Sequence, residues 1–485
     1  MFPLLWLTAS PALAMPLANA PTLPVDASWS RPLRLVLDTT GEPSSAPSPS
    51  PSCCERSFLI PALEVPAFII GLNLADRLFG KSYAYSGPGT FWEHLWHGPW
   101  EYDIDPLFAN VVAHPYTGSI YFNFARSSGL SFWWGLFYAA VGSALWELGG
   151  ETEPPSINDQ LFTPLGGAIL GEVLYRAYLL ILPQGERAGV PRHLAAFLVD
   201  PAAALNGLLF DGRFRSPEIE ERPPVSLLAQ LGGGYVWVNN PLIAGGNFSG
   251  PAGGVQFELE YGRPAAPDFN TRIPFSYFRF DAALIGDRQA FRETWRMQGF
   301  LGGWRLDGGT FHGVIGAFCS YDDVSAGVFR VSDVTAGLGA TGDVSLSQRL
   351  VLNGTLTLSG VLIGAVNTRV PPEKKGYHLG PGAAAALDLR LYAEDRAMLE
   401  LTSTFHFVSG NSKFPGHDLV DYSRLTAFVR LGGPHAIATA VSLAGRVAKN
   451  SIGPSFSQGA IALTLNYAWI PDRLFEDHSA RAGQP

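Results

Sequence analysis

Six ionisable residues lie in unusually apolar stretches of this chain, and their types suit acid–base chemistry. They are His114, Glu147, Glu151, Asp159, Glu172 and Arg176. A histidine among carboxylates activates water as a general base, or binds a metal ion through mixed nitrogen and oxygen ligands. If these side chains converge, they form a candidate catalytic pocket. The chain holds neither an H-E-x-x-H motif nor paired metal-binding cysteines, so the sequence predicts no metal and no cofactor.

A structural role is the preferred interpretation of the same residues. Glu172 and Arg176 are four residues apart, in the order that favours an ion pair within one helix. Charges in apolar surroundings need partners, and structural ion pairs perturb pKa values as active sites do. The other expected pairs join His114 or Arg126 to Glu147 or Glu151. Both interpretations predict that all of these side chains lie close together.

A second polar group lies in the segment FWEHLWHGPWEYDID. Its polar members are His94, His97, Glu101, Asp103 and Asp105. These residue types suit a metal or substrate site. However, tryptophans recur every four residues in the same segment, at Trp92, Trp96 and Trp100. An aromatic stripe of this kind favours a helix that rests on a membrane surface or packs on the rest of the protein.

Apolar runs with helical spacing predict the elements that position these residues. The expected helices span Phe58–Phe79, Phe91–Tyr102, Pro106–Phe124, Ser131–Leu148 and Pro164–Leu182. Thr163 is a suitable N-cap for the last helix, with Pro164 at the first helical position, where its missing N–H costs nothing. Two of these helices approach the membrane-spanning length of about 20 residues. An inner-membrane helical protein is therefore the alternative architecture.

The stretch from about residue 90 to residue 180 resembles the bacterial family called domain of unknown function 3943. The resemblance is carried by His114-Pro115 with Gly118, the Tyr121–Arg126 segment, Trp146-Glu147 with Glu151, Pro155-Ser156 with Asn158-Asp159, Thr163, and Gly171-Glu172 with Arg176. It covers less than a quarter of the chain. The resemblance implies no known activity.

From about Val225 the helical spacing gives way to strict alternation. In Val255–Tyr261, apolar residues occupy one face, and Gln256, Glu258 and Glu260 occupy the other. The same alternation recurs near residues 278–284, 387–391, 399–407, 424–431 and 461–469. Such strands are typical of a membrane-spanning barrel with an apolar outside and a polar lumen. The sequence therefore predicts an α+β chain, an N-terminal apolar helical domain followed by an antiparallel transmembrane β-barrel of about twelve strands.

The connections between the expected strands predict the topology. From the fourth connection onward, short turns (DGG, LSQR, AEDR and GPH) alternate with longer linkers. Outer-membrane barrels have short periplasmic turns and longer extracellular loops. An even number of strands then places both ends of the barrel in the periplasm. The helical domain is expected on the periplasmic side, or inside the lumen as a plug.

Charged side chains on the inner face predict a hydrated, salt-bridged lumen. The expected inward residues are Arg279, Asp281, Asp388, Arg390, Glu400, Arg424 and Arg430. A barrel of about twelve strands has a modest lumen, which side chains or a plug can fill. A Ser-His-Asp hydrolase in the barrel, using His312, His406 or Ser403, has no supporting motif.

Composition and termini complete the expected organisation. The expected parts are a signal peptide at 1–20, a Pro/Ser-rich disordered linker at 21–57, the helical domain at 58–220, the barrel at 225–470 and a C-terminal tail at 471–485. The net charge is −9 and no basic stripe appears, which excludes a nucleic-acid-binding surface.

These features leave three functions open. The preferred one is a non-enzymatic outer-membrane protein of a Gram-negative bacterium, for envelope organisation or for binding or passing a lipid or other apolar ligand. The alternatives are a membrane-embedded enzyme that acts on envelope lipid through the His/carboxylate pocket, and a small-solute channel. Outer-membrane lipid is the expected partner in each case, and no motif specifies an oligomeric state.

Overall fold

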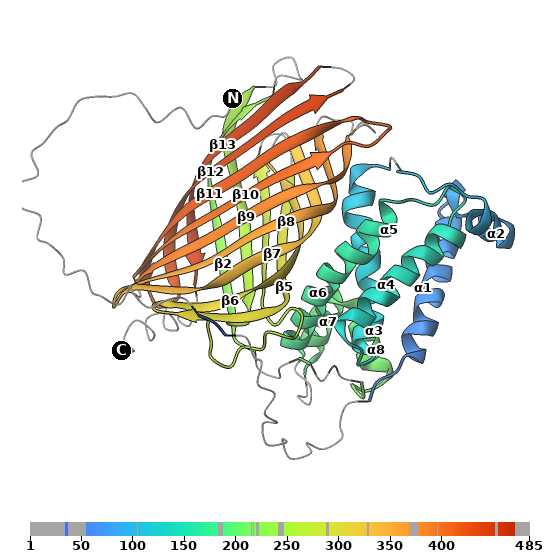
Figure 1. Cartoon of the computed structure of the whole chain (residues 1–485), viewed down its shortest axis with the longest axis horizontal. Coiled ribbons are helices and arrows are strands. Elements are labelled where there is room, and N and C mark those ends of the chain that lie inside the picture. The colour runs from blue at the N-terminus through green and yellow to red at the C-terminus, as the bar shows by residue number, and fades with distance from the viewer. Residues whose placement is uncertain are drawn as a thin grey trace, which may run out of the picture.

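The chain folds into a bundle of helices and a β-barrel that lie side by side (Figure 1). The computed structural model describes residues 34–36 and 55–470, apart from 104, 183–187, 215, 217, 220–222, 241–246, 288–290, 327–328, 369–376, 395 and 452–453. The expected signal peptide and C-terminal tail lie outside the described residues. Within the expected linker, Arg34–Val36 forms a short strand, β1, that pairs with β5.

Twelve antiparallel strands close into the barrel, as the alternating pattern predicted. They are β2 (Val225–Asn239), β3 (Phe248–Tyr261), β4 (Phe278–Asp287), β5 (Phe291–Gly308), β6 (Phe311–Ser325), β7 (Phe329–Ser347), β8 (Leu350–Thr368), β9 (His378–Ala393), β10 (Ala397–Ser409), β11 (Gly416–Gly432), β12 (His435–Asn450) and β13 (Phe456–Trp469). Each strand pairs with its neighbours in sequence, and β13 pairs with β2, so the sheet has no free edge among these strands.

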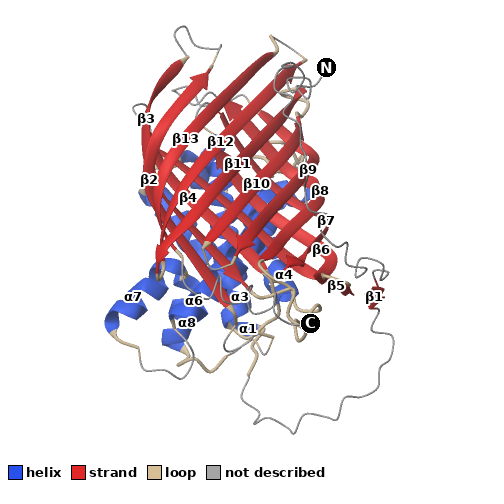
Figure 2. Cartoon of the chain, turned by 90° about the vertical axis from the view of Figure 1, so that its left-hand side faces the viewer, coloured by secondary structure: helices blue, strands red, loops and turns tan. Residues whose placement is uncertain are grey.

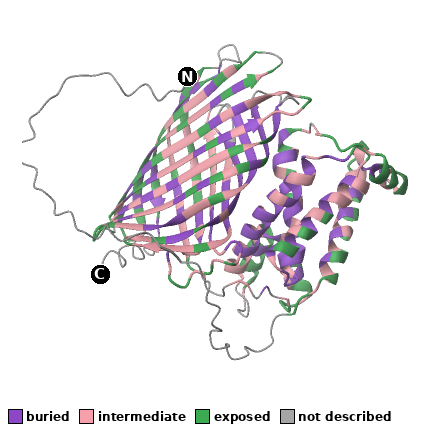
Figure 3. Cartoon of the chain, in the orientation of Figure 1, coloured by how far each residue is buried: buried purple, intermediate pink, exposed green. Residues whose placement is uncertain are grey.

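Exposure alternates along the strands in the way the sequence predicted (Figure 3). On β13, Leu463, Leu465 and Tyr467 are exposed on the outer face, whereas Asn466 is buried in the lumen. On β11, Leu425 and Val429 point outward and Thr426 points inward. The apolar face is therefore the outside of the barrel, which is the arrangement that a lipid environment favours.

The connections divide the barrel into two ends. Short turns join β5 to β6, β7 to β8, β9 to β10 and β11 to β12 at what we call the turn end, where β2 also begins and β13 finishes. The loop end carries the connections after β2, β4, β6, β8, β10 and β12. The longer β3–β4 connection, residues 262–277, lies at the turn end. The alternation of turns and loops follows the sequence prediction from the fourth connection onward.

The described residues before the barrel form eight helices. They are α1 (Leu59–Leu78), α2 (Pro88–Trp96), α3 (His114–Ser127), α4 (Phe132–Gly149), α5 (Asp159–Leu161), α6 (Gly167–Ile181), α7 (Val190–Val199) and α8 (Pro201–Leu209). A short 3-10 turn, η2 (Ser82–Ala84), separates α1 from α2, and two π-helical turns, η3 (Ala109–Ala113) and η4 (Phe162–Gly166), adjoin α3 and α6. By length and composition, α1 and the continuous helix Asp159–Ile181 are apolar enough to cross a membrane.

Glycines allow three of these helices to approach closely. A Cβ placed on Gly118 of α3 would lie 1.7 Å from the Thr163 carbonyl oxygen, and one on Gly167 would lie 2.6 Å from the Gly118 Cα. A Cβ on Gly142 of α4 would meet the Tyr121 ring. Lipid is as apolar as leucine, so helices in a membrane gain little from burying apolar side chains against each other. Close packing at small residues contributes to their association instead.

The start of the last long helix differs from the prediction. Thr163 is not an N-cap, because helical geometry begins at Asp159 and runs through η4 into α6. The main-chain nitrogen of Pro164 cannot donate, and the helix accommodates it with a wide π turn instead of a new start. Ser156 caps the earlier start, since its hydroxyl accepts a hydrogen bond of 3.2 Å from the Asp159 N–H.

The bundle packs against the outer wall of the barrel, neither beneath it nor inside it (Figures 1 and 2). Tyr321, Val334 and Ile363 form one row on the outer face of β6, β7 and β8, and all three are buried in a core shared with the bundle. The expectation of a plug in the lumen is thus corrected, and the periplasmic placement stays a prediction. The bundle extends along the wall, because its contacts reach from Pro274 at the turn end to Tyr377 and Lys413 at the loop end.

Candidate functional site

The six candidate residues divide into two clusters at opposite ends of the bundle. Asp159 and Glu172 are thirteen positions apart on one continuous helix, which corresponds to about 20 Å along its axis. Glu172 and Arg176 lie towards the turn end, where Arg176 contacts Pro274. His114, Glu147, Glu151 and Asp159 lie towards the loop end. The single pocket proposed from the sequence is therefore wrong.

The Glu172 cluster, formed by Arg126, Glu172 and Arg176, is a buried ionic triad. Arg176 Nε donates to Glu172 Oε1 over 2.8 Å, which confirms the predicted ion pair. Arg126 donates to both oxygens of the same carboxylate, over 2.7 and 3.0 Å. Sequence reasoning had expected Glu147 or Glu151 as the partner of Arg126. The difference arises because α3 and α6 cross closely, which brings residues 126 and 172 together.

Further donors of the triad also bond to oxygen atoms of the protein. Arg126 Nη1 donates to the Leu130 carbonyl oxygen and to the Ser216 hydroxyl, and Arg176 Nη2 donates to the Pro274 carbonyl oxygen. The Arg176 guanidinium also lies 4.9 Å from the centre of the Tyr261 ring. A fully buried carboxylate whose two arginines are both engaged has no side free for a substrate, so this cluster is structural.

The Asp159 cluster, formed by His114, Glu147, Ser156, Asn158 and Asp159, is a hydrogen-bonded network. His114 Nε2 lies 3.5 Å from Asp159 Oδ1, and its Nδ1 lies 3.3 Å from the Thr163 hydroxyl. Glu147 Oε2 accepts the Ser156 N–H over 2.7 Å. Asn158 Nδ2 donates to Asp159 Oδ1 over 3.0 Å. Both π turns adjoin this network, and such turns are frequent at functional sites.

Carboxylates crowd around this network outside the helices. Burial, followed by the charge of Asp159, raises the pKa of Glu151 to about 9. Burial, followed by the charge of Asp103, raises the pKa of Asp105 to about 6. Burial and the neighbouring carboxylates therefore favour the protonated form of Glu151.

These residues lie within a recognised segment. Residues 99–202 match the family described as a domain of unknown function, DUF3943. This confirms the resemblance seen in the sequence, and the DUF3943 segment supplies α3 to α7 and both clusters. No curated protein sequence matches the chain.

Several solved structures of outer-membrane barrels match the chain. The translocator domain of autotransporter NalP from Neisseria meningitidis is 17% identical, with a TM-score of 0.24, over 50% of this chain and 88% of that one. The anion-selective porin from Comamonas acidovorans is 10% identical, with a TM-score of 0.18, over 51% and 100%. The β domain of the Bordetella autotransporter BrkA is 10% identical, with a TM-score of 0.21, over 50% and 98%. At these values the matches concern the barrel fold and carry no argument about activity.

The segment that was predicted to form an aromatic helix, Phe91–Tyr102, overlaps the start of the DUF3943 segment. Trp92 and Trp96 on α2 are exposed, as is Trp100 beyond it. His94 is buried, and its Nδ1 lies 3.0 Å from the Glu147 carbonyl oxygen. His94 therefore joins α2 to the end of α4 and is not available to a ligand through that nitrogen.

Charged side chains fill the middle of the barrel lumen. Arg390 forms ion pairs with Glu258, Glu260 and Glu400. Arg279 forms ion pairs with Glu258 over 3.0 Å and with Glu400 over 2.9 Å. These links join β3, β4, β9 and β10 across the lumen. The predicted salt-bridged interior is present in the described part of the barrel.

Apolar layers lie on either side of the charged layer. Towards the turn end, Leu228, Tyr392, Met398 and Phe428 pack together in the lumen. Towards the loop end, a second layer includes Val236, Phe329, Val331, Val408 and Val420. Sequence reasoning identified the inward charges but missed these layers, because apolar residues at inward positions break the alternation only locally.

A cavity of about 120 Å³ remains in the lumen beside β2, β3, β12 and β13. Small residues line it on this side, among them Gly232, Gly254, Ala444 and Ala462. Arg424 lines it as well, and the buried Nη2 of this residue has no hydrogen-bond partner. A second cavity of about 80 Å³ also contacts Arg424.

Proposed function

We propose that this protein resides in the outer membrane of a Gram-negative bacterium and binds a small amphipathic ligand in the lumen of its barrel, without catalysing a reaction. The observation that carries the proposal is the cavity beside Arg424. Its volume of about 120 Å³ approaches that of a cavity of about 150 Å³ that admits benzene. The walls suit the apolar body of a ligand of that size.

Arg424 supplies the polar part of the proposed site. A buried guanidinium N–H without an acceptor is costly, and a ligand carboxylate satisfies it through a charge-assisted hydrogen bond. Glu400 lies near enough for the Arg424 charge to affect it, but its Oε1 already accepts hydrogen bonds from Arg279 and Arg390. The proposed ligand is therefore a small apolar molecule that carries one anionic group.

The two alternative functions have less support. A channel requires an open lumen, whereas two apolar layers and an ionic layer cross the described part of the barrel. The hypothesis of a membrane-embedded enzyme required six residues to converge. Glu172 and Arg176 instead lie in a separate cluster, where they are ion-paired. We therefore retain the non-enzymatic binding function.

Benzoate binding to the full chain in detergent micelles tests this function. We expect saturable binding of one benzoate, which Ala462→Phe abolishes because the new ring fills the cavity. Arg424→Gln should weaken benzoate binding on the order of tenfold and leave benzyl alcohol binding almost unchanged. Leu463→Phe, the adjacent residue on the outer face of β13, is the matched control and should bind normally. Absence of saturable binding to the unaltered chain, or undiminished binding to the Ala462→Phe variant, contradicts the proposal.

The proposed location can be tested by cysteine labelling on intact cells. In a background with the three native cysteines replaced by alanine, a cysteine at Asn411 should react with an impermeant reagent, because this residue lies in a loop-end connection. A cysteine at Gly433, in a turn-end connection, should not react. A cysteine at Leu63, exposed on α1, should react only with a membrane-soluble reagent, because we place the bundle beside the barrel at membrane depth. Labelling of position 433 but not 411, or impermeant labelling of position 63, contradicts this placement.

A further inference from the structure

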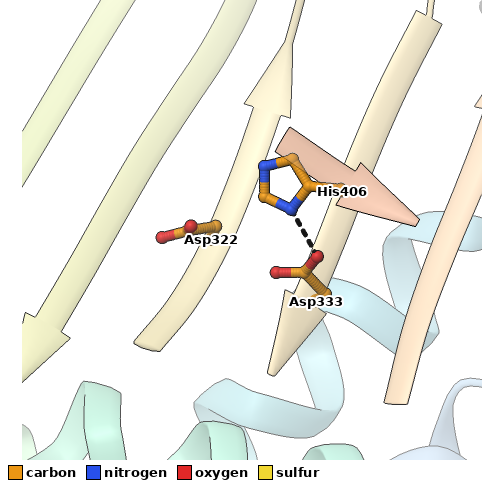
Figure 4. Close-up of side chains that lie close together, drawn as sticks. All are labelled: Asp322, Asp333 and His406. Carbon is orange, nitrogen blue, oxygen red and sulfur yellow. Dashed lines mark hydrogen bonds and ion pairs between the residues drawn. The ribbon is translucent and has the colours of Figure 1, made fainter. Parts of the chain in front are cut away.

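Three ionisable side chains meet inside the loop-end half of the barrel, away from the cavity beside Arg424. Asp322 on β6, Asp333 on β7 and His406 on β10 are all buried (Figure 4). One potential ligand atom from each residue lies within 4.8 Å of the other two. The sequence did not group them, because β8 and β9 separate β10 from β7 in the sheet.

The two carboxylates are placed against each other, and the Arg296 charge that acts on Asp322 is shared with Asp388. Asp322 and Asp333 are direct partners in the β6–β7 register, an arrangement in which like charges repel. Arg296 is opposite Asp322 in the register with β5, but its guanidinium is directed to Asp388, over 3.4 and 3.5 Å. In the described part of the chain, neither carboxylate forms an ion pair with a lysine or arginine.

Each of the three side chains also has a buried polar atom without a hydrogen-bond partner. These atoms are Oδ1 of Asp322, Oδ1 of Asp333 and Nε2 of His406. Buried polar atoms are normally satisfied, and three unsatisfied ones on neighbouring side chains point to a shared ligand. A positive ion is the ligand that two carboxylate oxygens and an imidazole nitrogen have in common.

The histidine is oriented for metal binding. His406 Nδ1 lies 2.6 Å from Asp333 Oδ2, and since a carboxylate only accepts, Nδ1 carries the proton of this hydrogen bond. In the neutral ring, Nε2 then has a free lone pair. Fixing one ring nitrogen through a carboxylate so that the other can bind is the usual support of a metal-binding histidine.

The backbone of β8 allows His406 on β10 to lie close to Asp333 on β7. Gly364 of β8 is the register partner of Asp333, and a Cβ there would lie 3.2 Å from the Asp333 Cβ and 3.0 Å from Val408 Cγ2. The β8–β9 register also shifts between Val361 and Gly364. The missing side chain and the irregularity let the lumen face of β10 come near that of β7.

A second buried histidine in the lumen, His378, lies beside a carboxylate that is paired with an arginine. His378 Nδ1 lies 2.8 Å from Asp418 Oδ2, and Arg446 donates to the other oxygen of the same carboxylate over 2.9 Å. The arginine supplies the positive charge in that group. No arginine takes this place beside Asp333 among the described residues.

We propose that Asp322, Asp333 and His406 form a binding site for a divalent first-row transition ion, with Zn²⁺ and Mn²⁺ as its chemical representatives. Mixed carboxylate and imidazole ligands suit such ions, whereas Ca²⁺ and Mg²⁺ prefer oxygen ligands alone. The ion neutralises the two facing carboxylates and draws the three side chains together. The sequence prediction of no metal relied on motifs with short spacing, and these ligands are contributed by three separate strands.

Metal analysis of the full chain tests the proposal. Protein purified in detergent and stripped with a chelator is dialysed against Zn²⁺ or Mn²⁺, and bound metal is measured after gel filtration. We expect one ion per chain, and its loss in Asp322→Asn and His406→Gln. His378→Gln is the matched control and should keep the ion, because it alters the arginine-compensated group. The Asp103→Asn/Glu153→Gln double variant should also keep it, which separates the site from the acidic side chains near the bundle.

Thermal unfolding provides a second measurement that does not depend on the amount of metal carried through purification. Added Zn²⁺ or Mn²⁺ should raise the Tm of the unaltered chain, since an ion that binds only the folded state stabilises it. Asp322→Asn should raise the Tm of the metal-free protein by removing like-charge repulsion, and should remove the increase caused by the metal. Absence of stoichiometric metal in the unaltered chain, equal binding in His406→Gln, or a metal-induced shift that survives in Asp322→Asn overturns the proposal.

Discussion

Replacing Glu172 by leucine should destabilise the folded protein by about 3 to 5 kcal/mol, the cost of leaving buried charges without a partner. Glu172 is the only carboxylate of its cluster, and both Arg126 and Arg176 donate to it. Without it, two guanidinium groups face each other in a buried space. Arg176→Met should be much milder, because it leaves a neutral pair of Arg126 and Glu172.

Compensation should require all three residues. Glu172→Leu combined with Arg176→Met still leaves Arg126 unpaired, so this double variant should stay unstable. The triple variant Arg126→Met/Glu172→Leu/Arg176→Met removes every charge and should recover most of the loss. Denaturant unfolding of the full chain in micelles, followed by tryptophan fluorescence, measures these differences. If Glu172→Leu is as stable as Arg176→Met, or the double variant recovers as fully as the triple, the triad does not act as a unit.

The barrel could be predicted from sequence because its signal is repeated. Alternation at residues such as Leu463, Leu465 and Tyr467 recurs in strand after strand, and each repeat supports the same fold. Turn and loop lengths then predicted which connections share one end of the barrel, without any knowledge of contacts. The alternation and the turn lengths of each strand favour the same fold as the whole barrel, so the fold could be predicted from them.

The position of the bundle could not be predicted in the same way. Its contacts with the barrel join residues far apart in sequence, such as Val111 with Tyr321 and Asn110 with Tyr377. The outward residues Tyr321, Val334 and Ile363 are apolar types that suit contact with lipid as well as with a helix. Alternation therefore identifies the outer face and does not reveal what covers it.

Ion pairs within the candidate sites could be predicted only where the two residues are close together in the sequence. Glu172 and Arg176 are four residues apart on one helix, and the pair formed as predicted. The partner of Arg126 depended on how α3 crosses α6, which no local pattern encodes. The group of Asp322, Asp333 and His406 depended on the register of several strands and on the space left by Gly364.

The crossing of α3 and α6 leads to the second large effect, which is expected for Gly118→Ala. The new Cβ would lie 1.7 Å from the Thr163 carbonyl oxygen and 2.6 Å from its carbon, both main-chain atoms that cannot rotate away. The helices must separate, so we expect a loss of about 3 kcal/mol, the upper end for overpacking, or more. The same shift should disturb the contact between His114 and Asp159, one turn away.

A matched glycine within the same bundle separates this clash from the general effect of the substitution. Gly71 lies inside α1, and a Cβ there would meet nothing within 4 Å. Gly71→Ala should therefore be neutral or stabilise the protein by up to about 1 kcal/mol, because alanine favours the helix. Denaturant unfolding of both variants measures the difference, and the ratio of folded to unfolded bands in unheated gel samples checks assembly of the barrel. Equal stability of the Gly118→Ala and Gly71→Ala variants would mean that α3 and η4 tolerate a wider separation, and that the close crossing is not what holds the bundle together.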